Sequence, residues 1–412
     1  NLNYILNIII ITLICLSMIN ILNYWSNISA YNLGSHERIF QNTNTIKNPS
    51  GNQKTSSNLP NIYYIILDGY ARSDIHKEIY KYDNSELINY LKEKKFYIAS
   101  KSRSNYCYTN LSLPSSLNFM YLDDIISNTD NQFYKTNIIN YHRENNRVFR
   151  FLKTLGYKTI IFYTGNTSVE RINSDIILCP MMPINEFQWS LISYTPLEEI
   201  IGKHLFSLEN LHRHRVLYCF DNIPDTTDMK SPFIVFAHIL CPHPPFVFGE
   251  NGEKVNNVKI NFFDATLYRD EAHETQEEYI EKYRNQSKFT SKKIIKTIDD
   301  ILTRSNTLPI IIIQADHGSG AFFDETSLEN ANLKERFSIL NAYYFPNNNY
   351  KHLYDTITPV NSFRVIFNTY FNCQYKLLKD KNYYSTTKDI FNFIDVTDKI
   401  DNKKTTVELQ SP

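Results

Sequence analysis

Short apolar runs alternate with amphipathic stretches of helical period along most of this chain. The clearest run, at residues 310–313, consists of four isoleucines and is followed closely by Asp316 and His317. A β-branched run that is apolar on both faces is typical of a strand buried in a parallel sheet. The alternation predicts an α/β domain, in which a largely parallel sheet is covered by helices on both faces. The expected strands are 62–67, 96–99, 158–163, 233–237, 310–313 and 341–345, and the expected helices are 84–95, 145–155, 274–304 and 360–371.

The first 25 residues form a separate apolar segment. Residues 2–22 carry no charge, and a run of about 20 residues is long enough to span a bilayer. Tyr24 and Trp25 follow, where an aromatic interface anchor is expected. A signal peptide is the alternative, but the segment has neither a basic start nor a small-residue cleavage site nearby. We therefore expect an N-terminal transmembrane helix at 1–25, a polar juxtamembrane linker at 26–60, a globular domain at 61–400 and a tail at 401–412.

Composition narrows the class of protein. The 412 residues contain 43 basic and 43 acidic side chains, so the formal net charge is zero. A nucleic-acid-binding protein needs a basic surface, so no nucleic-acid partner is expected. The six cysteines include no pair with zinc-site spacing, and the sequence leaves open whether any two form a disulfide.

Candidate metal ligands stand at the ends of three expected strands. Asp68 follows the first, His238 follows the run at 233–237, and Asp316 and His317 follow the isoleucine run. Because ligands bind at the carboxyl ends of the strands in open α/β sheets, these side chains are expected to lie close together. Two carboxylates and imidazoles suit a divalent ion, with Zn²⁺ or Mn²⁺ favoured and Ca²⁺ or Mg²⁺ as alternatives. Each residue alone could instead serve a turn or cap a loop.

A candidate nucleophile comes from a hydroxyl-rich segment at 107–118 that reads as a loop entering a helix. It carries Thr109, Ser112, Ser115 and Ser116. A helix N-terminus binds anions through its free backbone N–H groups, and a metal beside such a hydroxyl would lower its pKa and activate it. The alternative is that these residues only cap the helix.

Together these motifs resemble the alkaline phosphatase superfamily in its sulfatase-like branch. The likeness is greatest to membrane-anchored phosphoethanolamine transferases and lipoteichoic acid synthases. Residues 109–114 match the family's Thr-x2-Ser-x-Pro, which implies that Thr109 is the nucleophile. Residues 238–245 match His-x4-His-x-Pro, which implies that His238 and His243 serve the transferred phosphate or a second metal. Asp316 and His317 match the metal-binding Asp-His-Gly.

The chain also departs from the family pattern. Asp68 stands where the phosphoethanolamine transferases have glutamate, and the cysteine pair that flanks their nucleophile is missing. No histidine lies between Gly320 and Asn341, so the sequence leaves a second metal ion open. By the same resemblance, Arg336 is a phosphate contact, and the alternative is an exposed arginine on a helix.

The resemblance implies a membrane-anchored, metal-dependent enzyme whose catalytic domain lies outside the cytoplasm. Asp68, Thr109, Asp316 and His317 would bind the metal, and Thr109 would carry the covalent intermediate while a phosphoethanolamine- or phosphoglycerol-type head group is transferred or cleaved. The substrate would be a membrane lipid or a surface glycan. One alternative is a sulfatase acting through Ser112, although Ser116 stands where its motif needs arginine. Another is a non-catalytic surface protein that keeps the fold.

Overall fold

The computed structural model describes residues 59–126, 131–165, 171–180, 208–256, 258–259 and 264–401, together with six single residues among the first eighteen. The chain divides into two compact units, Asn1–Gln53 and Lys54–Pro412, and the second contains the fold described below. The transmembrane helix expected at 1–25, the linker at 26–60 and the tail at 401–412 fall almost wholly outside the described residues. Within the described ranges, no helix has the length and apolar character needed to cross a membrane.

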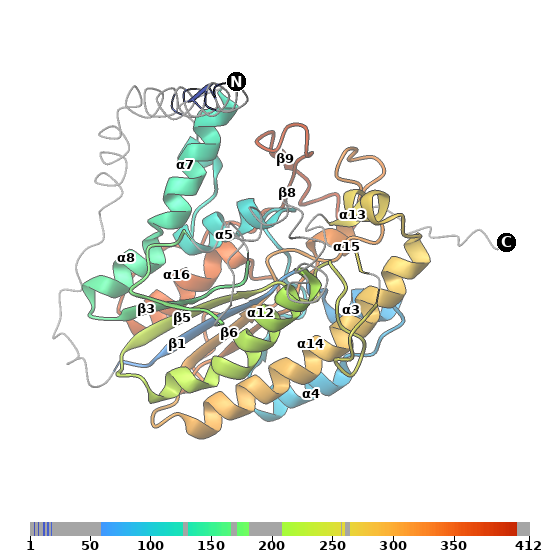
Figure 1. Cartoon of the computed structure of the whole chain (residues 1–412). Coiled ribbons are helices and arrows are strands. Elements are labelled where there is room, and N and C mark those ends of the chain that lie inside the picture. Colours follow the sequence, from blue (N-terminus) through green and yellow to red (C-terminus); the bar gives the residue numbers. More distant parts are fainter. Residues whose placement is uncertain are drawn as a thin grey trace. The chain divides into compact units, whose positions relative to one another are not determined.

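A seven-stranded sheet forms the centre of the domain, in the order β2-β7-β6-β1-β5-β3-β4 (Figure 1). Five neighbouring strands, from β6 to β4, are parallel, whereas β7 runs antiparallel to both β6 and β2. The expectation of a largely parallel sheet is therefore confirmed. The strands are β1 (Ile62–Leu67), β2 (Tyr97–Ile98), β3 (Lys158–Phe162), β4 (Ile176–Leu178), β5 (Phe233–Ile239), β6 (Ile310–Gln314) and β7 (Asn341–Tyr344).

Helices cover both faces of this sheet, and the two-residue period of β1 shows which helices lie on which side. Tyr63, Ile65 and Leu67 belong to a core cluster with residues of α4 (Ser85–Glu93), α12 (Leu208–Asn222) and α14 (Gln276–Arg304). Tyr64 points the other way. Its ring packs edge-on against Phe363 of α16 (Pro359–Tyr370), with centroids 5.1 Å apart, and its hydroxyl bonds to Ser116 of α5 (Thr109–Asn118).

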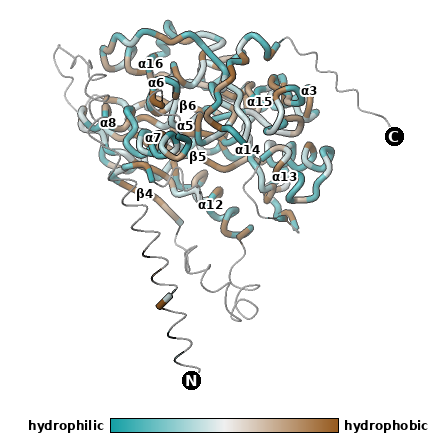
Figure 2. Tube along the Cα trace, turned by 90° about the horizontal axis from the view of Figure 1, so that it is seen from above, coloured by the Kyte–Doolittle hydropathy of each residue, from teal (hydrophilic) through white to brown (hydrophobic). Residues whose placement is uncertain are grey.

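Helix caps explain why two of the predicted helices begin two residues later in the structure. Asn146 precedes α8 (Arg147–Thr154), and its side chain accepts from the N–H of Phe149. Thr275 and Glu278 form a reciprocal capping box that starts α14 at Gln276. Figure 2 shows mixed polar and apolar colours along the surrounding helices, as expected for helices with one buried face. The remaining elements are α3 (Ser73–Glu78), α6 (Asp123–Ile126), α7 (Gln132–Glu144), the 3₁₀ helix η3 (Pro224–Asp228), α13 (Ala265–Ala272), α15 (Leu333–Phe337), β8 (Tyr383–Tyr384) and β9 (Ile394–Asp395).

Candidate active site

The predicted ligands meet at the carboxyl edge of three adjacent strands. β1 lies between β5 and β6, and Ile66 is in register with both His238 and Gln314. Asp68 follows β1 and Asp316 follows β6, as expected, whereas β5 continues to Ile239, so His238 lies within that strand rather than after it. The backbone N–H of Gly69 donates to Asp316 Oδ1 at 3.2 Å, which joins two of these strand ends directly.

Two groups of buried side chains in the described part of the chain are arranged to hold a metal ion. One consists of Asp68, His238 and Asp316, and the other of Asp68, His243 and His317, with the donor atoms of each group within 4.8 Å of one another. The Nε2 atom of His238 lies 2.9 Å from Asp68 Oδ2 and 3.9 Å from Asp316 Oδ2. The Nε2 atom of His317 lies 3.5 Å from Asp68 Oδ1 and 3.5 Å from Asp316 Oδ2. Asp68 belongs to both groups, so they form one continuous cluster.

Unpartnered polar atoms indicate that this cluster fits a divalent cation. Asp68 Oδ1 and both ring nitrogens of His238 are buried and have no hydrogen-bond partner among the described residues. Although His238 Nε2 is 2.9 Å from the Asp68 carboxylate, the two are not aligned as a hydrogen bond. Buried polar groups are nearly always satisfied, and carboxylates with imidazoles are a donor set that Zn²⁺ or Mn²⁺ accepts.

Hydrogen bonds fix which nitrogen of two histidines is available. His243 Nδ1 lies 2.6 Å from the Pro244 carbonyl, and His317 Nδ1 lies 2.8 Å from the Gly318 carbonyl. A carbonyl oxygen only accepts, so each Nδ1 must carry a proton. In the neutral ring, Nε2 then presents its lone pair, as a metal ligand requires.

The electrostatics favour the metal-binding protonation states of Asp68 and His317. Burial alone would raise the pKa of Asp68, but the charges of His243, His238 and His317 outweigh it and hold that pKa well below its usual range. Burial, followed by the charge of Arg336, lowers the pKa of His317. The cluster therefore keeps Asp68 ionised and His317 neutral. Burial alone would lower the pKa of His243, but the charges of Asp68 and then Asp264 outweigh it and raise that pKa.

Thr109 joins this cluster, whereas the neighbouring serines do not. It is the first residue of α5 and is half-buried, and its Oγ1 donates to Asp316 Oδ2 at 2.6 Å and lies 3.2 Å from His317 Nε2. The serine hydroxyls bond to carbonyls of their own segment: Ser112 to Tyr106, Ser115 to Met120 and Ser116 to Leu113. None of these serines caps the N-terminus of α5, and among the four hydroxyls Thr109 is the one directed at the candidate metal ligands.

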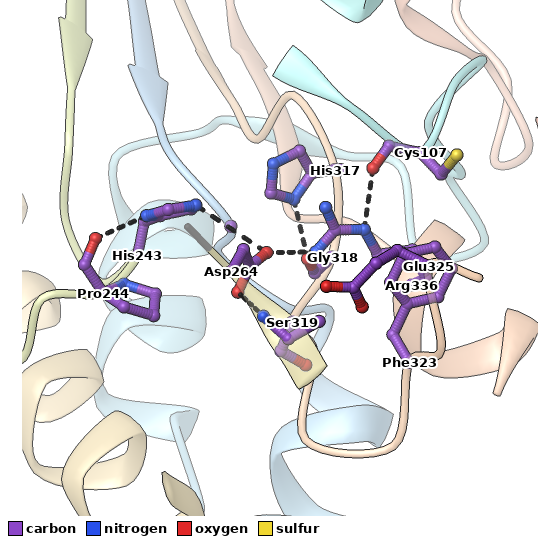
Figure 3. A network of polar contacts seen from close by, with 12 residues as sticks. Cys107, His243, Pro244, Asp264, His317, Gly318, Ser319, Phe323, Glu325 and Arg336 are labelled. Carbon is purple, nitrogen blue, oxygen red and sulfur yellow. Dashed lines mark hydrogen bonds and ion pairs between the residues drawn. The ribbon is translucent and has the colours of Figure 1, made fainter. Parts of the chain in front are cut away.

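Arg336 is 1% exposed, so the alternative of an exposed helical arginine is wrong. Figure 3 shows it between Asp264 and Cys107. Its guanidinium forms an ion pair with Asp264 and donates to the carbonyls of Cys107 and Gly318. Its role as a phosphate contact stays a prediction.

Asp264 is a site residue that the sequence did not reveal. Its Oδ2 lies 3.7 Å from His243 Nε2, and its Oδ1 accepts from the Tyr279 hydroxyl at 2.9 Å. Burial would raise the pKa of Asp264, but Arg336 and then His243 outweigh it and hold the pKa far below its usual range. Asp264 lies in a long connection without a motif, so only the folded contacts bring it to the site.

Comparisons with known proteins place the fold. No protein-family model matches the chain, and no curated protein sequence does. Among solved structures, the C-terminal periplasmic domain of EptC from Escherichia coli, in complex with zinc, aligns with a TM-score of 0.53 at 12% identity, covering 85% of this chain and 94% of that one. The periplasmic domain of the phosphoethanolamine transferase EptC from Campylobacter jejuni has a TM-score of 0.47 at 12% identity, with 78% and 92% covered. A protein in the alkaline phosphatase superfamily from Vibrio parahaemolyticus has a TM-score of 0.47 at 10% identity, with 80% and 74% covered.

The match to the EptC domain from Escherichia coli, with a TM-score of 0.53, shows a shared fold and so confirms the predicted resemblance at the level of the fold alone. The chain has a mixed α/β fold of that kind, with a cluster fitted to a divalent metal at the expected edge of the sheet. At such low identity, the activity has to be argued from the site itself.

Proposed function

We propose that this protein is a metal-dependent enzyme that transfers or cleaves a phosphodiester head group through a covalent phosphothreonine at Thr109. The observation that carries this proposal is the position of the Thr109 hydroxyl. It starts α5 and donates at 2.6 Å to Asp316, which belongs to the buried ligand cluster. A hydroxyl that served only to cap the helix would bond to the backbone of its own helix instead.

Asp68, Asp316 and His317 would hold the ion, and His238 and His243 stand within reach of the same cluster. A divalent ion bound there would lower the pKa of the Thr109 hydroxyl and offset the charge of the reacting phosphoryl group. Of the first four N–H groups of α5, those of Leu111 and Ser112 donate to the Tyr108 carbonyl, which leaves those of Thr109 and Asn110 to bind phosphoryl oxygens.

The chain's own groups supply the proton transfers. In the first half-reaction, Thr109 Oγ1 bonds to phosphorus and passes its proton to Asp316, while the bond from phosphorus to the leaving oxygen breaks. His243 or His238, carrying a proton on Nε2, donates it to that leaving oxygen. In the second half-reaction, the hydroxyl of a sugar, a lipid or water attacks the phosphothreonine and gives its proton to the same histidine. The bond from phosphorus to Thr109 Oγ1 breaks, and Asp316 returns the proton to Thr109.

The substrate class and location follow from the family resemblance and belong to the same proposal. The donor would be a membrane phospholipid of the phosphoethanolamine or phosphoglycerol type, and the acceptor a lipid or surface glycan. The segment at 1–25 would anchor the domain to the membrane, with the site outside the cytoplasm.

The direct test compares the wild type with Thr109→Val, which keeps the β-branched shape and removes the hydroxyl. Each protein is loaded with Zn²⁺ or Mn²⁺, its metal content is measured, and turnover of a chromogenic phosphodiester and head-group release from labelled phosphatidylethanolamine are followed. We expect the variant to retain metal but lose more than about 10³-fold in kcat. Full activity in Thr109→Val would refute the proposal.

A further inference from the structure

Arg336 joins three segments that each carry part of the candidate active site. Its Nε donates at 2.8 Å to the carbonyl of Cys107, two residues before Thr109. Its Nη1 donates at 3.3 Å to the carbonyl of Gly318, one residue after His317, and also pairs with Asp264. Because a guanidinium is planar and its donors are rigidly spaced, these contacts fix the three segments relative to one another.

The backbone around Arg336 strengthens this connection. The N–H of Gly318 donates to the Arg336 carbonyl at 2.6 Å, so main chain and side chain of Arg336 both hold the turn after His317. The guanidinium carbon of Arg336 also packs over the Phe323 ring, 4.6 Å from its centre. With 1% exposure, Arg336 has no open face toward a substrate.

Asp264 extends the connection to His243. Its Oδ2 is shared between the Arg336 guanidinium and His243 Nε2, which is 3.7 Å away (Figure 3). Its Oδ1 accepts from the Tyr279 hydroxyl, and from the N–H of Ala265 at 2.7 Å. The carboxylate is therefore held on both oxygens, and at 3.7 Å it acts on His243 through its charge rather than through a hydrogen bond.

We infer that Arg336 and Asp264 are positioning residues, which align Thr109, His317 and His243 on one metal ion without contacting the substrate. This inference rests on the proposed function, but it assigns Arg336 a role different from the phosphate contact that the family resemblance implies. A substrate contact would change binding of the phosphoryl group, whereas a positioning residue changes the geometry of the groups that bind metal and react.

The test uses Arg336→Lys, which keeps the charge but cannot reach both carbonyls and Asp264 with one ammonium group. The affinity for Zn²⁺ is measured by competition with a chromogenic chelator, and kcat, KM and inhibition by inorganic phosphate are measured on the zinc-loaded protein. We expect zinc affinity to fall about 10-fold or more, as for other residues that orient metal ligands. We expect kcat to fall about 10²-fold, with KM and phosphate inhibition unchanged.

Asp264→Asn provides an independent variant, since it keeps the side-chain shape and removes the charge shared by Arg336 and His243. It should show the same pattern, a loss of zinc affinity and kcat at constant KM. Arg304→Lys is the matched control, because Arg304 pairs with Asp225 and Asp228 on the surface and should change neither quantity.

Three results would overturn the inference. The first is a raised KM and weaker phosphate inhibition at unchanged zinc affinity, which would make Arg336 a substrate contact. The second is unchanged zinc affinity and kcat in both variants, and the third is loss of folding in both, which would assign the pair to stability alone. The zinc measurement needs no turnover, so it decides the inference even if the proposed function fails through an active Thr109→Val.

Discussion

Gly318→Ala is the substitution whose effect on the site can be worked out most closely from the structure. A Cβ atom at this position would lie 2.1 Å from the carbonyl oxygen of Glu335 and 2.8 Å from that of Arg336. Ordinary contact begins at 3.4 Å, so the new atom and the Glu335 oxygen must move apart by about 1.3 Å. Both obstructing atoms belong to the backbone of α15, so no side-chain rotation relieves the clash.

The required movement should reach the metal ligands directly. Gly318 follows His317, and its N–H bond to the Arg336 carbonyl holds the turn against α15. We expect the overpacking to cost about 1–3 kcal/mol in the free energy of unfolding. A displacement of about 1 Å at a reacting centre lowers turnover by about 10²-fold, so kcat/KM should fall by that order.

The assay pairs chemical unfolding of the metal-free protein with kcat/KM of the zinc-loaded protein. Gly249→Ala is the matched control, because the three atoms nearest to its Cβ all belong to the flexible side chain of Glu253, which can rotate away. We expect the control to behave as wild type. Wild-type kcat/KM in Gly318→Ala would refute the conclusion that close packing of this turn on α15 aligns the metal ligands.

Three further predictions concern the metal, pH and the rival nucleophile. Removal of the metal by a chelator should abolish turnover. Adding Zn²⁺ or Mn²⁺ back at 100 times its dissociation constant should raise the free energy of unfolding by about 2.7 kcal/mol. A melting temperature that does not change with metal would argue against the proposed metal site. Burial lowers the pKa of His76 from 6.5 to about 3. Between these two pH values only the unfolded state takes up this proton. This residue should therefore lower the free energy of unfolding by about 1.4 kcal/mol for each pH unit below 6.5. In His76→Phe, the free energy of unfolding measured with urea should depend less on pH between pH 6.5 and 5, whereas the exposed control His352→Phe should behave as wild type. An unchanged pH dependence in His76→Phe would contradict a lowered pKa of His76. Ser112→Ala should lose about 1 kcal/mol with its buried bond to the Tyr106 carbonyl but keep full turnover, whereas loss of turnover would favour the sulfatase alternative.

The sheet and most members of the candidate ligand cluster could be predicted from the sequence because their signals are local. β-branched runs such as 310–313 specify buried strands, and parallel strands bring their carboxyl ends to one edge, so Asp68, Asp316 and His317 could be assigned to one cluster. The antiparallel direction of β7 has no such signal. The connection after β6 contains only the short α15 and remains at the edge that carries His317, so β7 starts where β6 ends.

The rest of the site depends on contacts between distant segments. Arg336 lies in a helix of five residues, too short for its period to show which face is buried. Its partner Asp264 is 72 residues away in a connection without a motif. A buried ion pair of this kind is specified by the fold as a whole, so no local pattern could reveal it.

In the proposed reaction, Thr109 forms a covalent bond to phosphorus. The most direct measurement is rapid acid quenching of the metal-loaded wild type during turnover of a phosphodiester, followed by mass spectrometry of the peptide that contains Thr109. We expect a peptide heavier by the transferred phosphoryl group, with the modification on Thr109 and absent from Thr109→Val. Turnover without an adduct, or an adduct on Ser112, would contradict the proposed reaction.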